Sequence, residues 1–174
     1  SAYLKNPAST FGHLLIKFNS KNSLFGHSLL RPTLNFGARI DPSDNPLVYA
    51  LKGLFGAYKG SFTDERFYNF NHIYGENELR DLWEYPINFS LEEQERVISH
   101  AWELLQNINF KYYFFLDNCA YRMAELLEIA WEDESRINTS GAFWAIPVDV
   151  LFKIQKITGE KVSNNLLGRP LLIP

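Results

Sequence analysis

Apolar and polar positions along the chain follow two spacings, one typical of strands and one typical of helices. Two early segments, GHLLIKFN at 12–19 and PTLNFGARI at 32–40, are rich in apolar and aromatic residues and alternate imperfectly. Such alternation predicts half-buried strands. Because the polar stretch SKNSLFGHS separates them, we expect the two strands to pair as an antiparallel, hairpin-like unit.

The middle of the chain has less regular patterns. LVYALKGLFGAYKGSF at 47–62 carries three glycines among aromatic residues and is interpreted as a tight, aromatic-rich surface loop. DERFYNFNHIYG at 64–75 predicts a short helix. LWEYPINF at 82–89 is a strand candidate, and its Trp83 and Tyr85 are expected in the core.

Three helices are predicted in the second half. SLEEQERVISHAWELLQN at 90–107 opens on Ser90 with Glu93 three residues later, which is a capping box before a helically spaced apolar pattern. IPVDVLFKIQKIT at 146–158 forms another helix, with proline near its first turn. Between them, an amphipathic helix begins at or next to Cys119, and its apolar stripe consists of Met123, Leu126, Leu127 and Ala130.

The order of these elements predicts an α+β fold. At 174 residues, with 46% apolar and 16% aromatic content, the chain fits one domain with a substantial core. We therefore expect a single domain over 1–174, with a C-terminal helix and arm from about residue 143. The tail GRPLLIP is expected to be an edge strand or an extended arm.

Charge and composition exclude several classes of function. Twenty acidic and seventeen basic residues give a formal net charge of −3, and no block of Lys or Arg predicts binding to nucleic acid. No run of about 18 apolar residues predicts a membrane span. The polar start SAYLKNPAST does not predict a signal peptide. No cluster has the spacing of zinc ligands, so neither metal nor cofactor is expected.

The chain has one cysteine, Cys119, so no intrachain disulfide can form. A thiol at a helix N-terminus is favoured as the thiolate by backbone N–H groups and the helix dipole. A nucleophilic thiol also needs a base, most often histidine. Of the four histidines, His13 lies at the start of an apolar strand, which would hold it at a sheet end. His27, His72 and His100 are expected to be ordinary loop or helix residues.

Four motifs, in order, resemble the N-terminal periplasmic domain of the Lnb lipoprotein N-acyltransferase family. They are NPASTFGHLLIKF, YALKGLFGAYKGSF, ELRDLWEYPINFS and YYFFLDNCAYRMAELLE, and together they run from about Asn6 to Ala130. The resemblance implies a circularly permuted papain-like fold, in which an antiparallel sheet with the histidine strand packs against the helix that bears the cysteine. The histidine strand then precedes the cysteine helix, as His13 precedes Cys119 here.

The resemblance implies a site for this sequence. The histidine of FGH is His13, the cysteine of NC is Cys119, and Asn35 is the candidate third residue, set to bond the far ring nitrogen of the histidine. A strand-end Asn that bonds its own backbone is the alternative for Asn35. Asn118, with its neighbour Asp117, is interpreted as shaping or capping the turn before the helix, whose first-turn amides would hold an oxyanion.

The glycine-rich motif suggests where substrate binds. Phe55 and Tyr58 would line an acyl-binding groove or lie against a membrane, and Lys52 would meet lipid phosphates. The structural alternative is a loop that plugs the core with Phe55.

We therefore expect a cysteine-dependent acyltransferase that forms an acyl-thioester from a phospholipid or lipoprotein ester and passes the acyl chain to a lipoprotein amine. The resemblance places it in the periplasm, at the outer face of the inner membrane, with a membrane surface as a further partner. Two alternatives stay open: a papain-like amidase or peptidase that cuts cell-wall or other peptides, and a non-catalytic binding module with an inert thiol.

Overall fold

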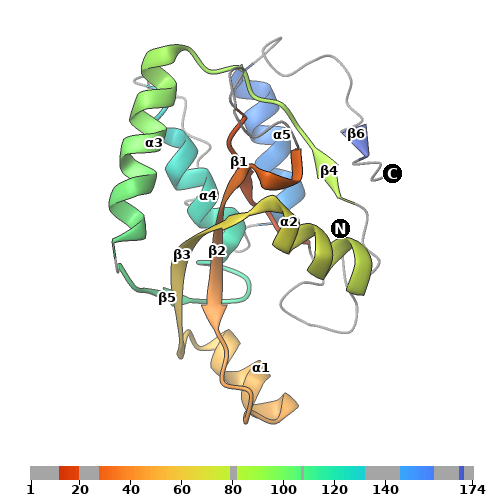
Figure 1. The fold of residues 1–174 in the computed structure, drawn as a ribbon. Helices are drawn as coiled ribbons and strands as arrows, with labels where there is room; N and C mark the ends of the chain where they lie inside the picture. The colour runs from red at the N-terminus through yellow and green to blue at the C-terminus, as the bar shows by residue number, and fades with distance from the viewer. Residues whose placement is uncertain are drawn as a thin grey trace.

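In the computed structural model, residues 12–19, 28–78, 82–106, 108–131, 146–158 and 169–170 are described. Their order of elements confirms the α+β class: helices and short strands are mixed along the chain (Figure 1). The strands are β1 (Ile16–Lys17), β2 (Pro32–Arg39), β3 (Tyr58–Arg66), β4 (Trp83–Glu84), β5 (Phe110–Tyr112) and β6 (Arg169–Pro170). The helices are α1 (Pro46–Leu54), α2 (Phe67–Phe70), α3 (Leu91–Leu105), α4 (Cys119–Glu128) and α5 (Pro147–Thr158), with short turns η2 (Ser28–Leu30) and η3 (Asn71–Asn77).

Four strands form one antiparallel sheet in the order β1-β2-β3-β5, and β4 pairs with β6 in a second, two-stranded sheet. The predicted antiparallel pairing of the first two strand segments is confirmed, since Ile16 lies opposite Leu34. The long β2–β3 pair is the centre of the larger sheet, and its register places Asn35 opposite Thr63.

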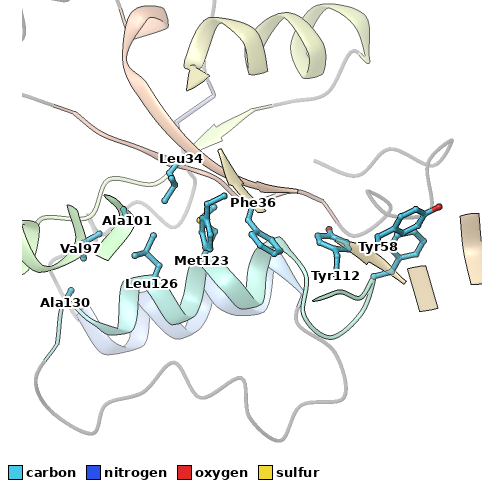
Figure 2. Packing of buried hydrophobic residues seen from close by; sticks show 11 residues of the cluster. Leu34, Phe36, Tyr58, Val97, Ala101, Tyr112, Met123, Leu126 and Ala130 are labelled. Carbon is cyan, nitrogen blue, oxygen red and sulfur yellow. The ribbon is translucent and has the colours of Figure 1, made fainter. Parts of the chain in front are cut away.

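The core lies between this sheet and the helices behind it. Leu34 and Phe36 of β2 point toward Met123 and Leu126 of α4, as Figure 2 shows. Val97 and Ala101 of α3 complete this cluster. The opposite side of α4 packs against α5, so that α4 is covered on two sides. The helix that begins at the cysteine is therefore held firmly at the centre of the described structure.

The three helices predicted in the second half are present, and the capping box of α3 is formed by Ser90 and Glu93. Only residues 169 and 170 of the tail are described, and there they form an edge strand. No described helix combines the length and apolar content needed to cross a membrane. The expectation of one domain over 1–174 stays a prediction.

Two predictions in the middle of the chain are wrong, and a third is confirmed in part. Residues 47–62 hold most of helix α1 and the first half of β3 rather than a loop. The short helix predicted in segment 64–75 is present, but it begins only at Phe67, because β3 continues to Arg66; α2 and η3 then make residues 67–75 helical. The segment 82–89 contains only the two-residue strand β4, and Trp83 and Tyr85 are 44% and 37% exposed rather than in the core. The core aromatics are instead Phe36, Phe62 and Tyr112, which come from β2, β3 and β5.

Candidate active site

Cys119 is the first residue of α4 and is placed there by its neighbour Asn118. The Asn118 side-chain oxygen accepts hydrogen bonds from the backbone N–H of Ala120 at 3.0 Å and of Tyr121 at 3.2 Å. Its Nδ2 donates to the Phe114 carbonyl at 3.2 Å. Asn118 is thus the N-cap of α4, as the sequence predicts, and it fixes the thiol at the positive end of the helix.

His13 and Asn35 are in direct contact. The distance from His13 Nε2 to Asn35 Oδ1 is 2.7 Å, and Asn35 Nδ2 donates to Thr63 Oγ1 at 3.3 Å. The second bond orients the amide so that its oxygen faces the ring. Because that oxygen can only accept, Nε2 carries the hydrogen in the neutral ring, and Nδ1 is then the unprotonated nitrogen.

The structure also brings His13 to Cys119. The thiol is only 4% exposed, and burial alone disfavours its thiolate. Burial is outweighed by the charge of the His13 imidazole and its hydrogen bond to the sulfur, together with hydrogen bonds from the backbone of Leu14 and Ala120, so that the pKa of Cys119 is lowered. A depressed thiol pKa beside a histidine is typical of a nucleophilic cysteine.

Two tyrosines next to this pair are not among the residues predicted from the sequence. The Tyr112 hydroxyl accepts a hydrogen bond from the backbone N–H of Cys119, and burial, with the neighbouring thiolate, raises the pKa of Tyr112. The ring of Tyr74 lies 5.6 Å from the His13 ring. Tyr112 lies in the aromatic segment that precedes the cysteine. Aromatic content predicts core packing, but it does not indicate which tyrosine hydroxyl reaches the site.

The expectation that first-turn amides hold an oxyanion stays a prediction, and in the structure these amides have acceptors within the chain. The N–H groups of Ala120 and Tyr121 already donate to the Asn118 cap. The N–H of Cys119 donates to the Tyr112 hydroxyl. The amides of Cys119, Ala120 and Tyr121 thus each have an acceptor within the chain, and the Tyr112 hydroxyl lies beside the first of them.

The three residues predicted to bind substrate have different environments. Phe55 is 76% exposed, so the alternative that it plugs the core is wrong. Tyr58 is buried in the core, and its hydroxyl donates to Asp44 at 2.7 Å. Burial and this carboxylate raise the pKa of Tyr58 to about 12. Lys52 pairs with the same Asp44 at 2.6 Å. Lys52 and Tyr58 thus anchor α1 to the strand that follows it.

Of the other histidines, the structure describes His72 and His100. His72 contacts Glu76 at 2.8 Å and His100 contacts Glu103 at 3.3 Å, each within its own helical segment. His27 lies outside the described residues. In the described ranges no group of three or more His, Cys, Asp or Glu is placed to hold a metal ion.

Comparison with known proteins gives one match. A family model described as the Lnb N-terminal periplasmic domain matches residues 1–154. Neither a search of curated proteins nor a search of solved structures found a match to this chain.

Proposed function

The chain belongs to the Lnb N-terminal periplasmic domain family, and from this membership and the geometry around its one cysteine we propose that it is a cysteine-dependent acyltransferase. The observation that carries the proposal is the contact of His13 with Cys119, backed on its far side by Asn35. A lone structural thiol does not need such partners. A nucleophile needs a base, and that base needs a group that fixes its tautomer.

In the proposed first half-reaction, the Cys119 sulfur attacks the carbonyl carbon of a lipid ester while Nδ1 of His13 takes the thiol proton. The Cys119 N–H and the Tyr112 hydroxyl stabilise the tetrahedral oxyanion. The carbon–oxygen bond of the ester then breaks, and the imidazolium returns its proton to the departing alkoxide. The products of this step are an acyl-thioester on Cys119 and a free alcohol.

In the second half-reaction, a neutral amine attacks the thioester carbonyl carbon. His13 takes a proton from the attacking nitrogen, the carbon–sulfur bond breaks, and the sulfur leaves as the thiolate that His13 can reprotonate. The net reaction converts an ester and an amine to an amide and an alcohol. No cofactor takes part in these steps. The acyl donor proposed is a phospholipid or lipoprotein glyceride, and the acceptor is a lipoprotein amine.

We further propose that the fold is a circularly permuted papain-like one. Two features support it: an antiparallel sheet carries the histidine segment at one edge, and this sheet packs against the helix that begins with the cysteine. His13 precedes Cys119 in the sequence, which is the order expected of a circularly permuted papain-like fold. The family is described as a periplasmic domain, and we place the reaction at the outer face of the inner membrane, where acyl donors are present.

The test is to trap the acyl-enzyme. The chain is incubated with phospholipid vesicles in the absence of amine, quenched in acid and weighed intact by mass spectrometry. We expect a mass increase equal to one acyl chain, reversed by hydroxylamine. Cys119→Ala should give no adduct, and His13→Ala should slow its formation by at least about a hundredfold because the base is lost.

His100→Ala is the matched control, since the His100 side chain is 34% exposed and contacts Glu103 of its own helix rather than the thiol. It should form the adduct at the wild-type rate. An adduct that persists in Cys119→Ala, or equal rates in the two histidine variants, would refute the assignment. An adduct formed only from peptide substrates would instead favour the amidase alternative, and a thiol inert to every donor would favour the binding module.

A further inference from the structure

Helix α1 presents an apolar stripe to solvent. Leu47, Leu51 and Leu54 follow one another at helical spacing, and Phe55 directly continues the stripe; their exposed fractions are 69%, 45%, 47% and 76%. These positions lie on the side of the helix opposite Gly53, which packs against the ring of Phe114. Figure 1 shows α1 projecting from one end of the sheet, away from the other helices. A row of exposed leucines on a projecting helix is an interaction surface.

A row of cations crosses the same end of the sheet. Arg39 of β2 lies opposite Lys59 of β3, and Lys59 lies opposite Lys111 of β5. Directly paired residues in adjacent strands point to the same face, so the three side chains form one basic row. All three are exposed, and within the described part of the chain none of them forms an ion pair. Because α1 connects β2 to β3, this row lies beside the base of the helix.

Two carboxylates, Asp41 and Asp44, lie in the segment between β2 and α1 at this end. Asp44 accepts from Lys52 and Tyr58, and Asp41 accepts from the backbone and hydroxyl of Ser43. Asp44 is paired with the cation Lys52, whereas the neutral Ser43 leaves the charge of Asp41 in place; the three cations of the basic row outnumber this one carboxylate. This end carries positive charge although the whole chain has a formal net charge of −3.

A second exposed apolar stripe, on α3, has the opposite surroundings. Leu91, Ile98 and Trp102 are 79%, 52% and 66% exposed. The same helix carries glutamates at 92, 93, 95 and 103, and its one arginine, Arg96, donates to the Ala130 carbonyl. Exposed apolar stripes thus occur once beside cations and once among carboxylates, which makes α3 a suitable comparison for α1.

We propose that the apolar stripe of α1 and the basic row Arg39–Lys59–Lys111 together form a surface that docks on a bilayer containing anionic phospholipid. Apolar side chains of a surface helix enter the interface, while neighbouring cations bind the anionic headgroups. The proposal does not depend on acyl transfer, because neither group takes part in the chemistry proposed above. It does bear on the site: the Phe114 N–H donates to the Gly53 carbonyl at 3.0 Å, so a docked α1 would hold the segment before Cys119 close to the lipid.

The first experiment measures vesicle flotation of the chain. We expect binding to vesicles of phosphatidylcholine mixed with phosphatidylglycerol, weakened by added salt, and little binding to phosphatidylcholine alone. The variant Leu47→Ser/Leu51→Ser/Phe55→Ser should bind at least about tenfold more weakly. The variant Arg39→Gln/Lys59→Gln/Lys111→Gln should bind about a hundredfold more weakly, at about fivefold for each cation.

The matched control is Ile98→Ser/Trp102→Ser on α3, which should bind as the wild type does. Thermal unfolding of every variant shows whether the fold is kept. Absence of wild-type binding, equal binding to neutral vesicles, or equal losses in the α1 and α3 variants would each overturn the proposal.

A second measurement needs no disruptive substitution. Phe55→Cys in a Cys119→Ala background gives one thiol for an environment-sensitive nitrobenzoxadiazole label. Its emission should shift to the blue on anionic vesicles, while the same label at Trp102→Cys should not shift. The Cys119→Ala background is inactive in the mechanism proposed above, so this result is independent of whether that mechanism is correct. No shift at position 55, or the same shift at both positions, would overturn the docking surface.

Discussion

At the scale of single residues, two effects compete at Cys119. Burial disfavours the thiolate, whereas the imidazole of His13 and the backbone of Leu14 and Ala120 favour it, and the favourable contacts prevail. Of these contacts, only that of His13 depends on a side chain that can be removed without disturbing the backbone. The sign of the pKa shift therefore depends mainly on one residue.

Removing His13 should reverse that shift. With burial left and the imidazole gone, His13→Ala should move the midpoint of the alkylation rate against pH to higher pH, because only the thiolate reacts. Iodoacetamide labelling followed by mass spectrometry measures the profile, with His100→Ala as the control that should follow the wild type. Superimposable profiles for wild type and His13→Ala would contradict the contact.

Tyr112 is the second residue with a testable role. Its hydroxyl lies at the Cys119 amide, so that the same hydroxyl can donate to the oxyanion of a tetrahedral intermediate whose carbon is bonded to the Cys119 sulfur. Tyr112→Phe keeps the ring, which stacks 5.7 Å from Phe36, and should lower the rate of acyl-enzyme formation about a hundredfold with the fold intact. Tyr121→Phe, in the first turn of α4, is the control. A rate within about twofold of wild type would exclude this role.

The sequence identifies the three central residues of this site, but not the tyrosines that surround them. His13, Asn35 and Cys119 are identifiable because their residue types match one chemistry and their motifs resemble one family. Tyr112 and Tyr74 are not, because a tyrosine in an aromatic run has no local signal that separates a hydroxyl in the site from one at the surface. Tyr112 is placed in the site by the pairing of β5 with β3, and Tyr74 is placed beside the His13 ring by the path of η3.

At the scale of elements, the largest error of sequence interpretation concerns 47–62, and its cause is the glycines. Read locally, three glycines predict turns. In the structure Gly56 does have a φ of +69° at the end of α1. Gly53 and Gly60, however, mark close packing: a Cβ at Gly53 would lie 2.2 Å from the Phe114 ring, and one at Gly60 would lie 2.6 Å from Phe36. Such contacts depend on residues distant in sequence.

At Gly53, helix propensity and packing have opposite effects on the free energy of unfolding when the residue is replaced by alanine. Propensity alone favours Gly53→Ala by about 1 kcal/mol, since alanine is the better helix former. The clash with Phe114 should instead destabilise the chain by about 1–3 kcal/mol. Urea unfolding measures the difference, and Gly37→Ala is the control because its Cβ would meet Asn35 at an ordinary 3.5 Å. A stabilised Gly53→Ala would mean that α1 does not pack closely on Phe114.

At the scale of the whole molecule, Lys17 joins elements that the sequence order keeps apart. Its side chain is only 7% exposed, and its ammonium lies 2.8 Å from Glu84 of β4. It also donates to Ser28 at 3.2 Å and lies 4.8 Å from the centre of the Phe67 ring. One cation in β1 therefore links the main sheet to η2, α2 and the second sheet. A periodicity argument cannot foresee this, because a lysine in a strand normally faces water.

The link through Glu84 makes part of the stability dependent on pH. Burial alone would raise the pKa of Glu84, but hydrogen bonds from Lys17 and Asn19 outweigh it and lower the pKa from its ordinary value of 4.5. A carboxyl whose pKa is lower in the folded chain stabilises above its ordinary pKa, and this contribution is lost as pH falls through the lowered value. Near pH 7, Glu84→Gln should therefore cost about 1 kcal/mol, or about 3 °C in Tm, because Glu84 is partly exposed.

Below about pH 3 the stability difference between Glu84→Gln and the wild type should close, because the wild-type carboxyl is then protonated and resembles the amide. Urea unfolding at a series of pH values follows the difference directly. Glu95→Gln, on the exposed side of α3, is the control and should show no such change with pH. A Glu84→Gln deficit that stays constant across the series would show that the side chain acts through packing rather than through its charge, and that Lys17 does not hold the two sheets together electrostatically.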